Sequence, residues 1–127
     1  MRLVEEVVEI QPGTRATCRR LTRSDDWFFQ GHFPGRPVVP AVVLVELLAQ
    51  TGGLVVGAGR TGGPPLQLHV AALGPFKFPA AAGPGATLEA QARFVGAMGG
   101  LFKIEGRVTA DGVLVAEGSV TLASRKA

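Results

Sequence analysis

Apolar and polar residues alternate along most of the chain, which is typical of strands with one buried face. The clearest case is Thr87–Val95, where every second residue is apolar and the residues between include Glu89, Gln91 and Arg93. Five other segments are also predicted to be strands: Leu3–Ile10, Thr14–Arg23, Leu66–Phe76, Leu101–Thr109 and Val113–Ala123. The pattern therefore predicts a sheet of about six strands.

Turn residues separate these segments. Asp111-Gly112 predicts a tight hairpin, since this dipeptide suits a turn that needs positive φ at both positions. Gln11-Pro12-Gly13 predicts a turn between the first two strands. Ser24–Gly35 is expected to be an aromatic-rich loop, and Pro79–Ala86 a turn-rich crossover. The strands are therefore expected to be mostly antiparallel.

One segment, from Pro40 to about Gly57, is apolar on nearly all sides and predicts a helix buried on most faces. Proline suits the first turn of a helix, and glycines suit its end. The wider stretch 38–58 also raises the question of a membrane span. Its one charge, Glu46, would cost several kcal/mol near mid-bilayer, so we interpret the segment as a core helix. The predicted fold class is α+β, with the sheet curled over one long central helix.

Composition narrows the class of protein. The length of 127 residues and the hydrophobic content of 46% fit a single domain spanning residues 1–127, and 18% charged residues argues against disorder. A net charge of +3 is weak evidence for nucleic acid, so we expect no nucleic-acid partner. Cys18 is the one cysteine and the two histidines are distant, so we expect no disulfide and no metal site. Acidic residues interrupt the first apolar run, unlike in a signal peptide, and a cytoplasmic location away from membranes is expected.

Gly57–Gly62 reads G-x-G-x-x-G, the spacing of a phosphate-binding loop. That function requires a strand before the glycines and a helix after them. Here the predicted helix precedes them and prolines follow, so we interpret the segment as a connector.

Two residues are candidates for acid–base chemistry. Glu46 is the one carboxylate between Trp27 and Leu88, and it lies in the most apolar part of the chain, where a carboxyl must be paired, protonated or functional. The alternative is that Glu46 shares a solvent-facing stripe with Gln50, one turn later. His32 lies in an aromatic loop just before the helix, although a lone loop histidine is often only a surface residue.

The start of the helix supplies a third element, because its backbone N–H groups and dipole stabilise a developing oxyanion. A base, an acid and an oxyanion donor in one short segment favour removal of a proton next to a carbonyl with loss of a leaving group.

The motif FFQGHFPGRPVVP at residues 28–40, followed by LVELLAQ at 44–50, closely resembles the 3-hydroxyacyl-[acyl-carrier-protein] dehydratases of the FabZ type. Glu46, where the related dehydratase/isomerases carry Asp, resembles the dehydratase-only branch. The resemblance implies a hotdog fold and no cofactor. It also implies homodimers, often trimers of dimers, whose active site lies at the dimer interface and accepts an acyl chain carried by acyl carrier protein.

The same resemblance assigns roles to individual residues. His32 would remove the α-proton of the 3-hydroxyacyl thioester, and Glu46 would protonate the departing hydroxyl. Gln50 would hold Glu46, and the N–H of Ala41 would polarise the thioester carbonyl. The remaining expected site residues shape the loop or the substrate tunnel: Gly31, Phe33, Leu68, Phe76 and Phe78.

The chain departs from the family pattern in several places. Ala41 stands where the family usually has Gly, no Tyr is present to gate the tunnel mouth, and residues 73–79 differ from the family's usual Phe-Arg-Arg-Pro. The family's N-terminal helical segment also has no counterpart before the first predicted strand. These differences bear on chain-length preference and rate more than on reaction class.

Other interpretations remain open. Arg19, Arg20, Arg23 and Lys77 form either a basic patch for acidic carrier protein or ordinary surface charge. The domain could also be a non-catalytic hotdog subunit or acyl-carrier binding module, or another hotdog enzyme such as a thioesterase or an enoyl-CoA hydratase. His69 is interpreted as an ordinary strand residue.

Overall fold

The computed structural model describes residues 2–30, 35–60, 62 and 67–125. Within them the chain forms six strands, one long helix and one short 3₁₀ helix. In chain order these are β1 Glu6–Gln11, β2 Arg15–Leu21, η1 Trp27–Phe29, α1 Ala41–Ala58, β3 Gln67–Lys77, β4 Thr87–Met98, β5 Leu101–Ala110 and β6 Val113–Arg125.

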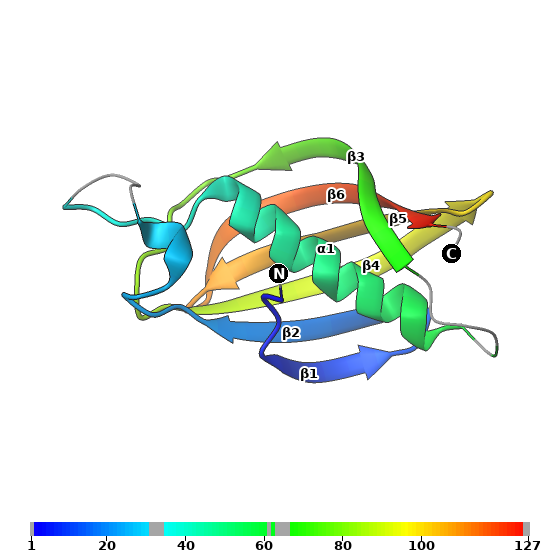
Figure 1. The fold of residues 1–127 in the computed structure, drawn as a ribbon, viewed down its shortest axis with the longest axis horizontal. Helices are drawn as coiled ribbons and strands as arrows, with labels where there is room; N and C mark the ends of the chain where they lie inside the picture. The colour runs from blue at the N-terminus through cyan, green and yellow to red at the C-terminus, as the bar shows by residue number, and fades with distance from the viewer. Residues whose placement is uncertain (1, 31–34, 61, 63–66, 126–127) are drawn as a thin grey trace.

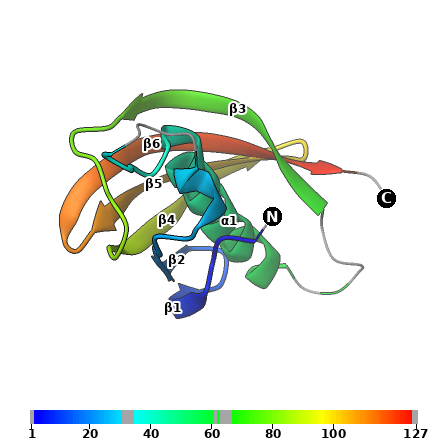
Figure 2. The ribbon, with the colours of Figure 1, turned by 60° about the vertical axis from the view of Figure 1, so that its left-hand side comes forward.

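The strands form one antiparallel sheet in the order β1-β2-β4-β5-β6-β3. Helix α1 crosses one face of this sheet, and the sheet curves around it (Figures 1 and 2). The contacts of α1 are mainly with β4, and then with β2, β5 and β6. The predicted α+β fold with a sheet wrapped around one helix is confirmed.

Helix α1 is buried because its apolar side chains fill the concave face of the sheet. Leu47, Leu48 and Val55 are fully buried, as is Ile104 on β5. The helix is long and apolar enough to cross a membrane, and among the described residues it alone meets that criterion. Its packing against four strands identifies it as the core helix of the sheet.

Two glycines allow this close packing. A Cβ at Gly52 of α1 would lie 2.9 Å from two side-chain carbons of Ile104, and a Cβ at Gly106 of β5 would lie 2.7 Å from Cδ1 of Leu48. Both distances are shorter than ordinary carbon–carbon contacts of 3.5–4.0 Å. Larger residues would therefore push α1 away from the sheet.

The predicted hairpin at Asp111-Gly112 is confirmed, with φ values of 48° and 86° between β5 and β6. The start of the first strand was predicted wrongly. Residues 3–5 lie outside the sheet and β1 begins at Glu6. At Leu3 the reason is that its N–H bonds to the side chain of Gln50 on α1 instead of to another strand.

The two edges of the sheet differ in character. The β1 edge is short and carries Glu6 and Glu9. The β3 edge has 11 residues, and Lys77 is the one Lys, Arg, Asp or Glu among them. Val70 and Leu73 are 39% and 55% exposed. A long apolar edge strand favours pairing with another strand.

Candidate active site

Helix α1 places Glu46 and Gln50 one turn apart on the same side, and both side chains are half-buried. Nε2 of Gln50 lies 3.5 Å from Oε1 of Glu46, at the long limit of a hydrogen bond. The sequence left two interpretations of Glu46, a buried acid or a solvent-facing one. The structure agrees fully with neither interpretation, because Glu46 is partly covered by protein and has a polar neighbour.

Gln50 is itself held by the N-terminal segment. The backbone N–H of Leu3 donates a hydrogen bond to Oε1 of Gln50 at 2.7 Å, and the Leu3 side chain is 1% exposed. No sequence signal marks this contact, because every residue except proline carries the same backbone donor.

The start of α1 lies about one and a half turns before Glu46. Ala41 is its first residue and is exposed, and Pro40 precedes it as the N-cap. Backbone N–H groups in the first turn of a helix have no acceptor within the helix and can bind an oxyanion. The chain segment just before α1 is held by a hydrogen bond of 2.8 Å from the N–H of Val39 to the carbonyl of Ala82.

The aromatic loop before the helix is anchored by η1. Phe28 and Phe29 are buried in the core, and Trp27 packs edge-on against Phe28 with ring centroids 5.5 Å apart. The guanidinium of Arg20 lies 5.7 Å from the centroid of the Phe28 ring and is also paired with Asp26. Three predicted site residues of this loop lie outside the described residues: Gly31, His32 and Phe33.

The three predicted tunnel residues lie on or next to the edge strand β3. Leu68 and Phe76 are half-buried against the core, and Phe78 is 44% exposed and stacked on Phe76. The ring of Phe76 occupies the space above Gly118, where a Cβ would lie 2.5 Å from it.

Three of the four basic residues considered for a carrier-protein patch are paired with carboxylates. Arg19 contacts Glu89 at 3.0 Å, and Arg23 contacts Glu5 at 2.7 Å. The hydrogen bond from Arg23 holds the pKa of the Glu5 carboxyl below its ordinary value. With Arg20 paired to Asp26, these arginines leave little uncompensated charge, which favours the interpretation as ordinary surface charge.

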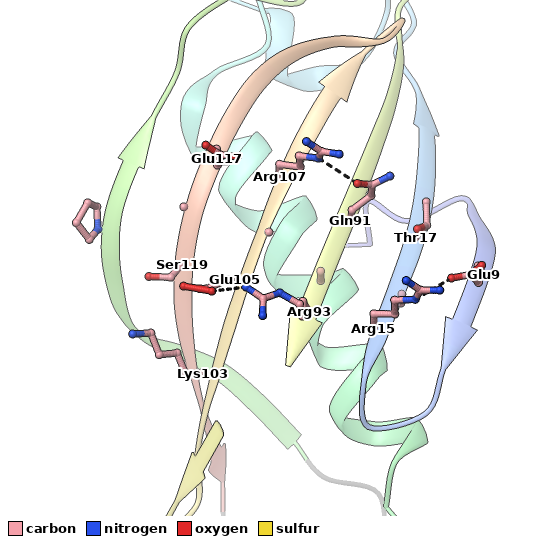
Figure 3. A pocket seen from close by; sticks show the side chains of 15 residues that line it. Glu9, Arg15, Thr17, Gln91, Arg93, Lys103, Glu105, Arg107, Glu117 and Ser119 are labelled. Atoms are coloured by element: carbon pink, nitrogen blue, oxygen red, sulfur yellow. Dashed lines mark hydrogen bonds and ion pairs between the residues drawn. The ribbon is translucent and has the colours of Figure 1, made fainter. Parts of the chain in front are cut away.

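A shallow hollow of about 890 Å³ lies on the opposite face of the sheet from α1 (Figure 3). Two ion pairs across strands lie in its lining, between Arg93 and Glu105 at 2.7 Å and between Arg15 and Glu9 at 3.2 Å. Neither Glu46 nor Gln50 lines it, so the hollow is separate from the candidate site. Within the described residues, no group of three His, Cys, Asp or Glu side chains could hold a metal ion.

The family model described as "FabA-like domain" matches residues 1–119. The chain belongs to this family. It is 36% identical to the 3-hydroxyacyl-[acyl-carrier-protein] dehydratase FabZ of Roseiflexus sp. over 95% of this chain and 84% of the relative. The FabZ of Nitratidesulfovibrio vulgaris is 38% identical over 95% and 79%, and that of Syntrophotalea carbinolica is 33% identical over 91% and 78%. The resemblance to FabZ dehydratases is thus confirmed.

Solved structures confirm the hotdog fold. The dehydratase heterocomplex ApeI:P from Xenorhabdus doucetiae superimposes with a TM-score of 0.77 at 14% identity, over 98% of this chain and 84% of that chain. The PaaI protein from the phenylacetic acid degradation operon of E. coli gives a TM-score of 0.72 at 13% identity, over 95% and 79%. At these identities the likeness concerns the fold.

Proposed function

We propose that this FabZ-type protein dehydrates (3R)-3-hydroxyacyl-[acyl-carrier-protein] to the trans-2-enoyl thioester, in fatty acid or related lipid synthesis in the cytoplasm. His32 takes the α-proton, the bond from C3 to the hydroxyl oxygen breaks, and Glu46 gives the proton with which that hydroxyl leaves as water. The N–H of Ala41 polarises the thioester carbonyl. The imidazolium and carboxylate left behind exchange a proton, directly or through water, before the next turnover.

The position of Glu46 carries this proposal. It is a half-buried carboxyl on the core helix, with an anchored amide beside it and the helix start about one and a half turns away. An acid that must donate a proton in the transition state needs a fixed position close to the reacting atoms. The family identity supplies the reaction class, and this placement supports Glu46 as the acid.

We further propose that a second copy of the chain completes the site. The long apolar β3 edge would pair with the β3 edge of the second copy, and the exposed α1 side chains Val42 and Leu54 would be covered in the same interface. Glu46 of one subunit then works with His32 of the other. Leu68, Phe76 and Phe78, on or next to β3, would border the acyl tunnel.

The test is a spectrophotometric assay of the reverse reaction. A trans-2-enoyl thioester on acyl carrier protein loses its ultraviolet absorbance when water adds to the double bond. We expect His32→Ala and Glu46→Gln each to lower the rate at least a hundredfold, the usual scale of general acid–base catalysis. Glu105→Gln is the matched control, because Glu105 lies on the opposite face of the sheet in an ion pair with Arg93.

Mixing the two inactive variants tests the shared site. If His32 and Glu46 come from different subunits, each mixed dimer regains one intact site of two. Random subunit exchange would then restore about a quarter of the wild-type activity. No recovery, with mixed dimers shown to form, would place both residues in one subunit. Loss of absorbance that is independent of His32, or a wild-type protein that binds acyl carrier protein without turnover, would contradict the dehydratase assignment.

A further inference from the structure

We propose that the N-terminal segment, residues 2–5, is a positioning element of the active site. Through its backbone N–H, Leu3 fixes which end of the Gln50 amide faces Glu46. This inference rests on the proposed function of Glu46 and extends it to a part of the chain outside the sheet and the helix.

The orientation of the Gln50 amide follows from hydrogen-bond chemistry. Oε1 of Gln50 accepts the N–H of Leu3 at 2.7 Å, so Nε2 occupies the other side of the amide, 3.5 Å from Oε1 of Glu46. A flipped amide would set its N–H₂ donors against the donor of Leu3 and its oxygen against the carboxyl of Glu46. The contact with Leu3 would set donor against donor whatever the protonation state of Glu46, so the backbone N–H of Leu3 favours the orientation that presents N–H to Glu46.

The donor is held in place without help from Gln50. The Leu3 side chain is 1% exposed and packs in the core, and the N–H of Glu5 bonds to the carbonyl of Arg19 at 3.0 Å. The Glu5 carboxylate accepts the N–H of Leu21 at 2.9 Å and Arg23 at 2.7 Å. Residues 2–5 are therefore held in place by contacts of their own, and the Gln50 amide takes the orientation that suits the N–H of Leu3.

The expected consequence is a loss in turnover rather than in substrate binding. Without the Leu3 donor, the preference of the Gln50 amide for this orientation weakens, and Glu46 faces an amide of less well-defined polarity. We expect kcat to fall about tenfold. This is the loss expected when one hydrogen bond is removed whose net free-energy contribution lies near the upper end of the usual range. KM should change less than about twofold, because neither Leu3 nor Gln50 is assigned a contact with the substrate.

Amide hydrogen exchange tests the bond independently of activity. In the wild type the N–H of Leu3 should exchange slowly although it lies outside the sheet. In Gln50→Met, which keeps the side-chain length but removes the acceptor, it should exchange at least about tenfold faster. The N–H of Glu5, bonded to Arg19, is the internal reference and should stay protected. An unprotected Leu3 amide in the wild type, or equal protection in both proteins, would overturn the inference.

Replacing one backbone amide by an ester tests the effect on catalysis. The hydroxy-acid analogue of leucine at position 3 removes the donor and keeps the side chain. The control is the matching ester at Phe94, whose N–H bonds to the carbonyl of Thr14 at 2.8 Å. We expect the lower kcat only at position 3. Equal losses in both variants, or no loss at position 3, would reject the positioning role, whereas an inactive wild type with a protected Leu3 amide would reject the dehydratase assignment alone.

Discussion

The close packing of Gly106 on β5 against both β4 and α1 predicts that Gly106→Ala destabilises the protein strongly. A Cβ at this position would lie 2.1 Å from the backbone oxygen of Gln91 on β4 and 2.7 Å from Cδ1 of Leu48 on α1. The side chain of Leu48 could rotate away only within a fully buried environment. The carbonyl of Gln91 belongs to the backbone of the neighbouring strand, so β5 itself must shift.

The size of the effect follows from these contacts. Overpacking of a core by one methyl group usually costs 1–3 kcal/mol, and a clash with backbone lies at the upper end, so we expect about 3 kcal/mol. For a domain of this length each kcal/mol lowers Tm by roughly 3–5 °C, which gives a decrease of about 10–15 °C. Because α1 carries Glu46 two residues before Leu48, turnover should also fall in the folded variant.

Urea unfolding followed by circular dichroism, at one fixed protein concentration, measures the change. Gly96→Ala is the matched control, since Gly96 lies in β4 and a Cβ there would meet nothing within 4 Å. We expect this control to be neutral or slightly stabilising. Equal stability of Gly106→Ala and Gly96→Ala would refute the idea that β5 packs against β4 and α1 too closely to admit a side chain at position 106.

Two further predictions concern buried groups. Burial raises the pKa of the Cys18 thiol above its ordinary value of about 9, so at pH values between the two the thiol loses its proton only in the unfolded state. The free energy of unfolding should therefore fall as the pH rises above about 9, and it should fall less in Cys18→Ala. Urea unfolding at each pH measures the difference. Thr22→Val should lower the free energy of unfolding by about 1–3 kcal/mol, because the buried hydroxyl of Thr22 accepts the N–H of Ala86 at 2.9 Å and valine leaves that donor unpaired. In the control Thr14→Val, where Thr14 is exposed, the free energy of unfolding should change by less than about 0.5 kcal/mol.

Much of the fold could be predicted from local patterns. Apolar patterning and turn residues located all six strands, apart from the start of β1, and the apolar run located α1 within one residue at each end. The hairpin at Asp111-Gly112 was predictable because few dipeptides tolerate two positive φ angles. Each of these signals depends on residues that are close together in the chain, which is why one sequence was sufficient to find them.

The structure shows the relative positions of some of the predicted site residues. The motif around residues 28–50 named Glu46 and Gln50 and the family, and the structure places these two side chains side by side on α1. The motif did not predict the pairing of Arg19, Arg20 and Arg23 with carboxylates, because Arg19 and its partner Glu89 are brought together only by the β2–β4 register.

The sequence by itself therefore determined the elements, the fold class and the family of this protein, since periodicity and motif spacing are properties of neighbouring residues. Tertiary structure alone decided that Leu3 leaves the sheet and donates its backbone N–H to Gln50. That contact joins residues 47 positions apart. It uses a donor common to nearly all residues, so only the packing of the folded chain selects it.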